Sequence, residues 1–583
     1  MSETTGGALV ARVLEQEGVD HFFGIVDGSY TQLFAQLVEL GMRMVSPRHE
    51  SIAMHMAGAY ARLSGKLGVA IASNGPGVAN VLPGVAVENG EGNRVLLLTS
   101  SRRTGITYPD RGGAYQCFDH CAVIRPMAKW SESAQSYERI PELLRTALRM
   151  CWTGRPGVVH LDLPENLING NGPALALPPP HAYRRTEPLE PSDRDVERAA
   201  EMLAHARLPI IHAGSGVLHA HASEELARVA ELLHAPVTTS WGGRGALSEL
   251  SPLAWPMVHV EANNKLRNEA DLVLCVGSDV GETDWWGKAP YWAPSFRQRW
   301  IQVDVDERVL GRNRPVSLAV LADAKRFLAR LAEALAGRSM PIAERRKAVA
   351  TLAEDKSADR SALDAVLANR KAPMVTAHVG VAAREVFADD AIAVFDGGNA
   401  AVWGNFYTEI RTPGAALATA HFGHLGAGVG QALGACIARP DKQVFCILGD
   451  GAMAFQMQEI ETAIRNELRP VFLVCADRQW GMVKINQKVA LGPVKESFKF
   501  ALGPDHEGTI NTDLGEIEWN RVAEAMGAHG ERVSHPDELV PALQRCVAAK
   551  RCAVVHVDVD PGAHLFAPAL LHFKAMHAEP AGE

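Results

Sequence analysis

Short apolar runs recur along most of this chain, and stretches with helical spacing separate one run from the next. Eleven runs stand out, at residues 21–26, 68–73, 94–100, 157–164, 208–214, 271–277, 300–306, 391–398, 443–451, 470–477 and 553–560. Runs of this kind are typical of strands buried on both faces of a parallel sheet. Their alternation with helical patterns predicts an α/β protein built from doubly wound parallel sheets.

Two stretches without strand patterns divide the chain. Residues 173–195 are rich in proline and charge and cannot hold a sheet or a long helix, whereas residues 337–373 are charged and helical in pattern. A chain of 583 residues is too long for a single core. We therefore expect three α/β domains, at residues 1–172, 190–337 and 373–583.

Composition narrows the class of protein. A net charge of −9 argues against nucleic acid as a partner, because phosphate backbones require a concentrated basic surface. The chain has no run of 18 apolar residues and no signal-like N-terminus, so we expect a cytoplasmic protein without a membrane span. Its nine scattered cysteines indicate reduced packing residues. Cys117 and Cys121 lack a second pair at zinc-like spacing.

Two acidic residues follow neighbouring apolar runs. Asp450 lies in a Gly-Asp-Gly turn, and Asp477 ends the run PVFLVCAD 27 positions later. If the runs are adjacent parallel strands joined by a helix at about 455–465, both carboxylates emerge at the ligand-binding edge of the sheet. A phosphate at that edge would require a hard cation between the acids. The spacing predicts a magnesium-bridged diphosphate, and the alternatives are a simple turn at Asp450 and a helix cap or surface acid at Asp477.

A third acidic residue, Glu50, starts a predicted helix. One face of that helix carries Met54, Ala57, Gly58 and Ala61 at helical spacing. A carboxyl group on such a face loses hydration, which favours its protonated form and suits it to proton transfer. The alternative is an exposed first-turn glutamate that the helix dipole stabilises.

These motifs resemble those of thiamine diphosphate enzymes, in the branch of acetolactate synthase and pyruvate decarboxylase. The Gly-Asp-Gly turn followed 27 positions later by Asn or Asp is similar to the family's magnesium signature, and the resemblance covers nearly the whole chain. It implies a first domain that binds the aminopyrimidine ring, a central domain and a third domain that binds the diphosphate. It also implies that magnesium is held by the side chains of Asp450 and Asp477 and by the backbone carbonyl of Gln479. Family members commonly carry Asn at the Asp477 position.

The resemblance also implies roles for Glu50 and for four further segments. Glu50 would hydrogen-bond the aminopyrimidine ring and promote its imino form, so that the cofactor carries the chemistry. Because the family's glutamate and diphosphate site come from different subunits, a homodimer or homotetramer with active sites at subunit interfaces is implied. In segment 421–430 Gly423 would contact the cofactor's amino group, and Leu425 would separate its two rings, although ordinary leucine packing is an alternative. The other cofactor contacts would be Gly75, Pro76, Gly398, Asn399, Ala400, Gly449, Gly451, Ala452, Trp480, Gly481, Met482 and Val483.

The type of reaction is inferred from positions at which this chain differs from some members of the family. The groups with which simple pyruvate decarboxylases release an aldehyde are absent, since Gly28 and Val483 stand where acids would lie. Tyr115 and Gln116 instead resemble the Phe-Gln pair of acetolactate synthase-like carboligases. We expect a 2-oxo acid to be decarboxylated and an acyl-anion equivalent to pass to a carbonyl acceptor. His120, His421 and His424 are candidate proton shuttles, against the alternative of hydrogen-bonded packing.

Several alternatives stay open at this point. Asn486 replaces the tryptophan of the acetolactate synthase acceptor pocket, and residues 277–287 match only the length of the corresponding stretch in 2-hydroxyacyl-CoA lyases and oxalyl-CoA decarboxylases. A CoA-dependent enzyme would need a basic patch, for which Arg102, Arg103 and Arg111 are the candidates. FAD or ADP in the central domain is undecided, and a catalytically silent regulatory homologue is a third hypothesis. The tail at 562–577 covers an active site or packs on the surface.

Overall fold

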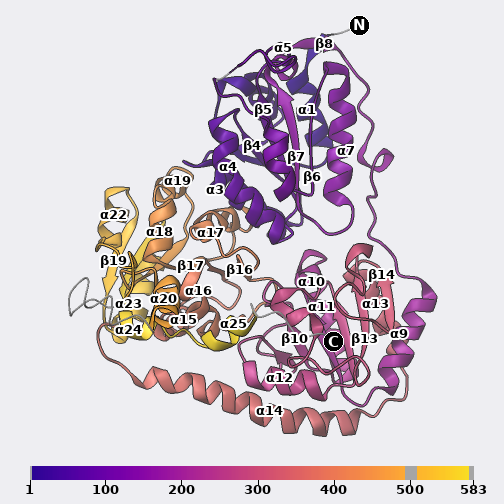
Figure 1. The fold of residues 1–583 in the computed structure, drawn as a ribbon, viewed down its shortest axis with the longest axis vertical. Coiled ribbons are helices and arrows are strands. Elements are labelled where there is room, and N and C mark those ends of the chain that lie inside the picture. The colour runs from indigo at the N-terminus through magenta and orange to yellow at the C-terminus, as the bar shows by residue number, and fades with distance from the viewer. Residues whose placement is uncertain (1–2, 114, 493–507, 577–583) are drawn as a thin grey trace. The chain divides into compact units, whose positions relative to one another are not determined.

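The computed structural model describes residues 3–113, 115–492 and 508–576. It contains three sheets of six parallel strands each, with helices on both faces (Figure 1). This arrangement confirms the expected α/β class, because all eleven apolar runs contain a strand. None of the described helices has the length and apolar content that a bilayer crossing needs. All nine cysteines, which lie in the described part of the chain, are free thiols, and eight of them are buried.

The first sheet has the strand order β3-β2-β4-β5-β7-β6. Its strands are β2 His21–Gly24, β3 Arg43–Val45, β4 Gly68–Ala72, β5 Val95–Ser101, β6 Trp130–Ser133 and β7 Val158–Pro164. Its helices are α1 Gly6–Gln16, α2 Thr31–Glu39, α3 Glu50–Ser64, α4 Pro76–Gly90, α5 Thr104–Thr107, α6 His120–Ile124, α7 Ile140–Trp152 and α8 Glu165–Ile168. Strands β1 Glu3–Thr5 and β8 Asn171–Pro173 pair antiparallel, so they join the two ends of this domain.

Helix α3 is buried on every side. All of its residues from Glu50 to Arg62 are buried, so it has no solvent face of the kind that its apolar spacing suggests. The reason is helix α17 (Ala427–Ala438), which belongs to the same compact unit and packs along α3. A Cβ atom at Gly434 would lie 2.5 Å from the Met56 carbonyl oxygen, so glycine allows this close approach.

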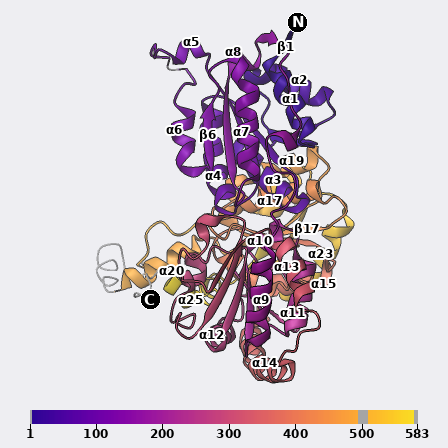
Figure 2. The ribbon, with the colours of Figure 1, turned by 90° about the vertical axis from the view of Figure 1, so that its right-hand side faces the viewer.

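The central sheet has the order β11-β10-β9-β12-β13-β14, and its helices lie on both of its faces (Figure 2). Its strands are β9 Pro209–Ala213, β10 Val237–Thr239, β11 Ala254–Trp255, β12 Leu272–Val276, β13 Arg299–Asp304 and β14 Leu318–Leu321. Its helices are α9 Asp193–His205, α10 Ser215–His219, α11 Ser223–Leu233, α12 Val260–Glu269, the 3-10 segment η5 Glu282–Gly287 and α13 Ala324–Leu335. The charged stretch that follows forms the 23-residue helix α14 (Ile342–Asp364), as its pattern predicts.

The third sheet has the order β16-β15-β17-β18-β20-β19. Its strands are β15 Ile392–Phe395, β16 Ala416–Ala418, β17 Val444–Gly449, β18 Val471–Ala476, β19 His529–Val533 and β20 Ala553–Asp558. Its helices are α15 Ala377–Val386, α16 Gly398–Tyr407, α18 Asp450–Gln456, α19 Glu459–Arg465, α20 Gly481–Ala490, α22 Trp519–Ala525, α23 Pro536–Ala548 and α24 Pro561–His564. The last helix, α25 Leu570–Met576, contacts η5 of the central domain. The expected crossover helix at 455–465 is in fact two helices, the first of which starts at Asp450 itself.

The central and third domains belong to one compact unit. Buried Arg244 contributes to their contact, because its guanidinium pairs with Glu249 at 2.8 Å and donates to the Thr408 carbonyl at 2.8 Å. It also donates to the carbonyl of Asn405. One buried cation therefore links the loop after β10 to the end of α16.

Candidate active site

Asp450 and Asp477 lie at the same edge of the third sheet. Strands β17 and β18 pair in parallel with Gly449 opposite Cys475, so each acid comes directly after a paired strand end. Each side chain is only 6% exposed. This placement matches the spacing argument from the sequence, in which a parallel pair delivers both carboxyl groups to the ligand-binding edge.

The hydrogen bonds of the two acids leave room for a ligand. Asp450 accepts from the backbone N–H groups of Gly451 at 2.7 Å and Arg478 at 2.8 Å. The Asp477 Oδ2 atom is buried without a hydrogen-bond partner, and so is the Oδ1 atom of Asn399 on α16. Because buried polar atoms are nearly always paired in native structures, two unpaired oxygens in one place point to an external partner.

Burial disfavours the charged form of both acids. Burial, followed by the charge of Asp477, raises the pKa of Asp450 to about 6, and burial raises the pKa of Asp477 to about 6. In the described part of the chain, no three His, Cys, Asp or Glu side chains converge as metal ligands. A cation here would therefore use the two carboxylates together with backbone and external oxygens, which suits the hard cation Mg²⁺.

Glycines bring the surrounding groups close to the two acids. A Cβ atom at Gly481 would lie 2.9 Å from the Asn399 amide nitrogen and 3.2 Å from Asp477 Oδ2. A Cβ atom at Gly451 would lie 2.5 Å from the Trp480 ring. Gly398, which has φ 74°, starts α16 shortly after strand β15, which pairs in parallel with β17. The N–H groups of the first turn of α16 are therefore directed to the same edge, where they can bind phosphate oxygens.

His564, in the chain's tail, is a site residue that the sequence argument missed. It is 3% exposed, its Nδ1 atom lies 2.7 Å from the Thr376 hydroxyl oxygen, and its Nε2 atom lies 3.9 Å from Asp477 Oδ2. Its carbonyl accepts from Asn399 at 3.2 Å and from Trp403 at 3.1 Å. The start of the tail therefore packs beside Asp477, whereas Phe566 and Leu571 farther along are 64% and 81% exposed. Position 577 of the predicted segment lies outside the described residues.

Glu50 lies in the other compact unit, at the first position of α3. It is 8% exposed, and its Oε2 atom accepts from the Asn80 side chain on α4 at 3.1 Å. Segment 421–430 packs against the same helices, because the His421 N–H donates to Glu91 at 2.7 Å and the ring centroids of His424 and His55 lie 5.9 Å apart. Segment 421–430 therefore lies in the same compact unit as Glu50. Leu425 is half-buried beside Gly423, whose φ is 62°.

A buried hydrogen-bond network supports the turn at Gly75 and Pro76. The Gly75 N–H donates to His120 Nε2 at 3.4 Å, and His120 Nδ1 lies 3.1 Å from Asp162. Asp162 also accepts from Thr99 at 2.8 Å. Both ring nitrogens of His120 are thus engaged inside the protein, and Asp162 was missed although it stands out in the apolar run GVVHLDLP.

Gln116 is held beside this turn in a strained conformation. Its φ is 53°, a region that L residues rarely adopt, and a Cβ atom at Gly75 would lie 2.7 Å from its Cα atom. Backbone strain of this kind tends to occur at functional sites. Its neighbour Tyr115 is 73% exposed, so the described chain does not enclose that ring.

The remaining predicted residues differ in exposure. Trp480, Gly481 and Met482 are half-buried at the start of α20, whereas Val483 is 50% exposed. Burial lowers the pKa of His424 to about 4, so this imidazole is neutral at pH 7. The neutral ring of His424 is therefore a weak proton acceptor.

The metal-free protein is expected to lose stability between about pH 4 and pH 6 through the two aspartates. Their pKa in the folded chain is about 6, above the ordinary value of 3.8, so the folded state binds protons that the unfolded state has released. Stability from these groups is present below pH 4 and declines as the pH rises through 6. Calorimetric melting of wild type against the double variant Asp450→Asn/Asp477→Asn should show a difference that grows across this window. A constant difference would contradict the buried charge pair.

Comparison with known proteins agrees with this geometry. Residues 4–123 match the family model described as Thiamine pyrophosphate enzyme, N-terminal TPP binding domain; residues 196–331 match the central domain, and residues 396–557 match the C-terminal TPP binding domain. The chain is 28% identical over 576 residues to a probable acetolactate synthase large subunit of Methanococcus aeolicus, covering 96% of this chain and 93% of that protein.

Two further relatives span nearly the whole chain. The acetolactate synthase isozyme 3 large subunit of Escherichia coli is 27% identical, covering 97% of this chain and 96% of that protein. The 2-hydroxyacyl-CoA lyase of Arabidopsis thaliana is also 27% identical, covering 96% of this chain and 97% of that protein. Taken with the three matched domains, the α/β fold and the paired acids, these likenesses establish that the chain belongs to the thiamine pyrophosphate enzyme family, as an enzyme of acetolactate synthase-like type.

Proposed function

We propose that this protein is a Mg²⁺- and thiamine diphosphate-dependent carbon–carbon lyase or carboligase, which decarboxylates a 2-oxo acid and transfers the acyl-anion equivalent to a carbonyl acceptor. The observation that carries the proposal is the buried pair Asp450 and Asp477, with an unpaired carboxylate oxygen, at one sheet edge of the domain that matches the TPP-binding model. When bound, the cofactor supplies a nucleophilic carbon that can stabilise an acyl carbanion.

The residues present fit both groups. Asp450, Asp477 and the Gln479 carbonyl would hold Mg²⁺; that carbonyl accepts from the Gly481 N–H at 2.9 Å and keeps a second lone pair. The first turns of α16 and α18, with Gly398, Asn399, Ala400, Gly451 and Ala452, would bind the diphosphate. Gly449, which ends β17, would let the diphosphate approach the backbone closely.

In the other compact unit, Glu50 would hold or release a proton at the aminopyrimidine ring. The Asn80 amide orients its carboxyl group through the 3.1 Å hydrogen bond. Gly423 and Leu425 would contact the cofactor's amino group and rings. His120 takes a positioning role, because it holds the Gly75 turn while Asp162 fixes its ring.

The proposal also includes the assembly of subunits and the residue that contacts the substrate. We infer a homodimer or homotetramer in which Glu50 of one subunit serves the diphosphate site of another. A partner subunit would then cover Tyr115 and Val483, which are exposed in the single chain. Gln116, beside the Gly75 turn, would contact the substrate, and its strained backbone supports that role.

FAD and ADP do not belong to the proposal. The glycine turn HAGSGVLH packs directly against the loop after β12, since a Cβ atom at Gly214 would lie 2.1 Å from the Gly277 carbonyl oxygen. A Cβ atom at Gly216 would lie 2.6 Å from the Gly277 Cα atom. These glycines serve contact between the two loops, so the turn by itself does not support a nucleotide site.

The variant His564→Ala is expected to weaken Mg²⁺-dependent cofactor binding by about tenfold, as loss of a group that orients a metal ligand does. If the Thr376 hydroxyl donates to Nδ1, the Nε2 atom carries a proton that faces Asp477 and keeps that carboxylate in place. Calorimetric titration of thiamine diphosphate at several Mg²⁺ concentrations measures the effect. The matched control is His181→Ala, in the exposed linker. Equal affinities in both variants would show that His564 only fills space.

The proposed reaction is tested by product analysis. Purified protein with thiamine diphosphate and Mg²⁺ is incubated with a panel of 2-oxo acids, with and without aldehyde or 2-oxo acid acceptors, and products are identified by mass spectrometry. We expect carbon dioxide and a hydroxyketone or 2-hydroxy-3-oxo acid. Cofactor binding without turnover on the whole panel would favour the catalytically silent homologue instead.

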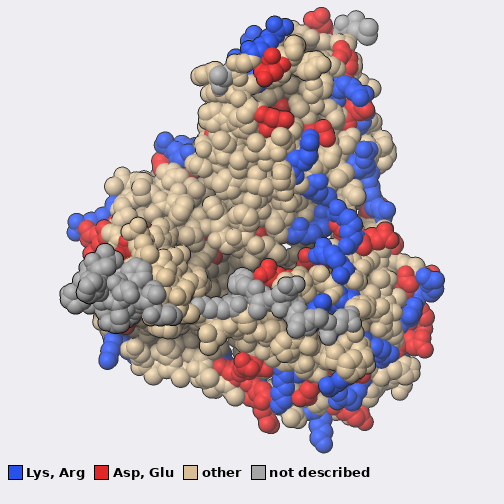
Figure 3. All heavy atoms as spheres, in the orientation of Figure 1, with Lys and Arg blue, Asp and Glu red and all other residues tan. Residues whose placement is uncertain are grey.

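A CoA-thioester lyase or decarboxylase is the second candidate function. The likeness to a 2-hydroxyacyl-CoA lyase over nearly the whole chain favours it. The candidate basic patch is partly neutralised, because Arg102 and Arg103 lie 3.9 and 3.5 Å from Glu165. Figure 3 shows basic and acidic side chains next to each other at the end of the domain that carries α5. Cleavage of 2-hydroxyacyl-CoA, with no carboligation of free acids, would replace the first proposal.

A further inference from the structure

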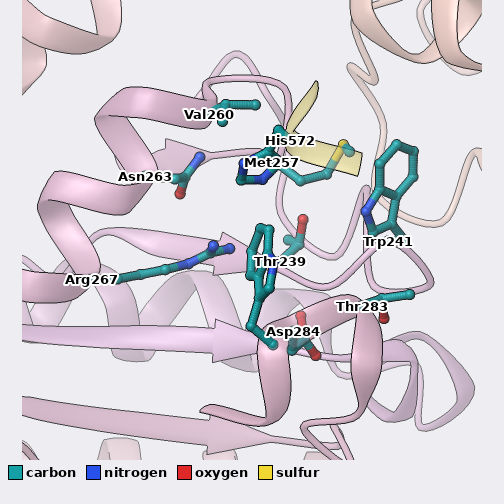
Figure 4. Close-up of a pocket in the computed structure, with 10 residues that line it drawn as sticks. Thr239, Trp241, Met257, Val260, Asn263, Arg267, Thr283, Asp284 and His572 are labelled. Carbon is teal, nitrogen blue, oxygen red and sulfur yellow. The ribbon is translucent and has the colours of Figure 1, made fainter. Parts of the chain in front are cut away.

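One cluster of buried charges, in the central domain, is balanced within the protein. Figure 4 shows Arg267 and Asp284 at the same pocket, which has room for about one water molecule. Burial lowers the pKa of Arg267 to about 10, and the charge of Asp284 opposes that shift. The two groups therefore offset each other without a ligand.

Another cluster of buried charges lies between helices α3 and α4 of the first domain. Glu88 and Glu91, three positions apart at the end of α4, are 0% and 1% exposed. Glu88 is satisfied inside the domain, because its two oxygens lie 2.8 Å from His55 Nδ1 and 2.6 Å from the Asn93 amide nitrogen. Burial lowers the pKa of Arg62 on α3, and the charges of Glu91 and Glu88 oppose that shift. Arg62 therefore offsets part of the negative charge of the two acids.

Glu91 contacts a residue that is far away in the chain. Its Oε1 atom accepts from the His421 backbone N–H at 2.7 Å, and its Oε2 atom lies 3.2 Å from the ring Nδ1 atom of the same residue. A hydrogen bond to an ionised carboxylate is stronger than one between neutral groups. One buried glutamate thus fixes both the backbone and the side chain at the first residue of segment 421–430.

Helix α17 anchors the other end of this segment against α3. A Cβ atom at Gly430 would lie 2.7 Å from the His55 Cβ atom, so the two helices are in direct contact. Between the two anchors, Gly423 and Gly426 have φ values of 62° and 89°. Because glycine has more accessible conformations than other residues, the position of this backbone depends on how firmly its two ends are held.

We propose that Glu91 is a positioning residue for the subsite of the aminopyrimidine ring. By holding His421 it fixes the Gly423 carbonyl, which would accept a hydrogen bond from the cofactor's amino group. This role, which rests on the proposed function for the identity of the ligand, concerns the ring end of the cofactor. Asp450 and Asp477 would serve the diphosphate end.

The reach of the Glu91 side chain, and not its charge, should determine the effect of a substitution. Glu91→Asp keeps the charge but withdraws the carboxylate from His421. Glu91→Gln keeps the reach, and its amide oxygen still accepts from the His421 N–H. We expect thiamine diphosphate to bind about tenfold more weakly to Glu91→Asp than to the wild type, and within about twofold of the wild type to Glu91→Gln.

Two calorimetric titrations at saturating Mg²⁺ separate the ring end of the subsite from the diphosphate end. Thiamine diphosphate occupies both ends, whereas inorganic pyrophosphate occupies only the diphosphate end. Pyrophosphate should therefore bind equally to Glu91→Asp and to the wild type. In the cofactor-free proteins, amide hydrogen exchange at His421 should be faster in Glu91→Asp than in the wild type and unchanged in Glu91→Gln.

The matched control is Glu17→Asp. Glu17 is another buried glutamate of the same domain, which accepts from Arg184 at 2.7 Å and from Tyr183 at 2.6 Å. Shortening it should cost stability but leave the affinity for the cofactor unchanged.

The contrary outcomes are distinct. Equal cofactor affinity in Glu91→Asp and the wild type, or an equal loss in Glu17→Asp, would show that Glu91 is merely structural and overturn the proposal. So would a loss in Glu91→Gln as large as that in Glu91→Asp, or weaker pyrophosphate binding in Glu91→Asp. A wild type that binds neither thiamine diphosphate nor pyrophosphate would contradict the proposed function itself, and with it this role of Glu91.

Discussion

The variant Glu50→Gln is expected to form product about 100 to 10,000 times more slowly than the wild type, the usual range for loss of a general acid–base group. The amide keeps the shape and the hydrogen bond from Asn80 but cannot hold and release a proton. Because Glu50 is buried, no solvent group is placed to substitute for it. Steady-state product formation and calorimetric binding of thiamine diphosphate should be measured together, since binding is expected to be largely kept.

Two further variants provide a smaller expected effect and a control for the rate of Glu50→Gln. Asn80→Ala removes only the donor that orients Glu50, so a smaller decrease of about tenfold is expected. Glu142→Gln changes an exposed glutamate of the same domain, which pairs with Arg139 at 2.7 Å, and should leave the rate unchanged. An undiminished rate in Glu50→Gln with normal cofactor binding would remove Glu50 from the mechanism.

The second large effect is expected at the metal site. Asp450→Asn should weaken Mg²⁺-dependent binding of thiamine diphosphate on the order of a hundredfold, or ~2.7 kcal/mol. The amide removes one of the two negative charges that would attract the cation. Asp477→Asn should cost less than tenfold, because an amide oxygen is also a hard ligand and the family commonly carries Asn there.

The same variants separate lost binding from unfolding. Without metal, Asp450→Asn should melt at a higher temperature than the wild type near pH 7, because one of two repelling buried charges is gone. Asp441→Asn, at an exposed position, is the matched control and should bind the cofactor normally. Normal Mg²⁺-dependent binding by Asp450→Asn would show that the metal lies elsewhere.

The interior strands were predictable from the sequence, because they are apolar on both faces. Strands β17 and β18 are examples, since all but one of their residues are buried. The short edge strands were not, because they are half-solvated and carry no continuous apolar run. Strand β19 (HGERV) contains two charged residues and is mostly half-buried.

Helix α3 shows a different limit of sequence reasoning. The spacing of its apolar residues suggests one buried face, yet α17 covers the opposite side. The two helices are more than 350 positions apart in the chain. Local periodicity cannot reveal such a partner, although the small residues of α17 are typical of close helix packing.

Site residues that directly follow the end of a strand could be predicted from the sequence. Asp450 and Asp477 follow paired strands, so spacing alone brings them together. His564 and Asp162 were missed because their roles depend on tertiary contacts with Asp477 and His120. The burial of Arg267 on α12 was not predictable either, since a helical arginine ordinarily lies in solvent.

The central claim is that two buried aspartates bind a divalent cation, which in turn holds the diphosphate of the cofactor. The most direct measurement is calorimetric titration of thiamine diphosphate into the wild-type protein with Mg²⁺ and then with the cation removed by a chelator. The account predicts one molecule bound per chain with Mg²⁺ and binding weaker by at least about a hundredfold without it. Equal affinity under both conditions, or no binding under either, would contradict it.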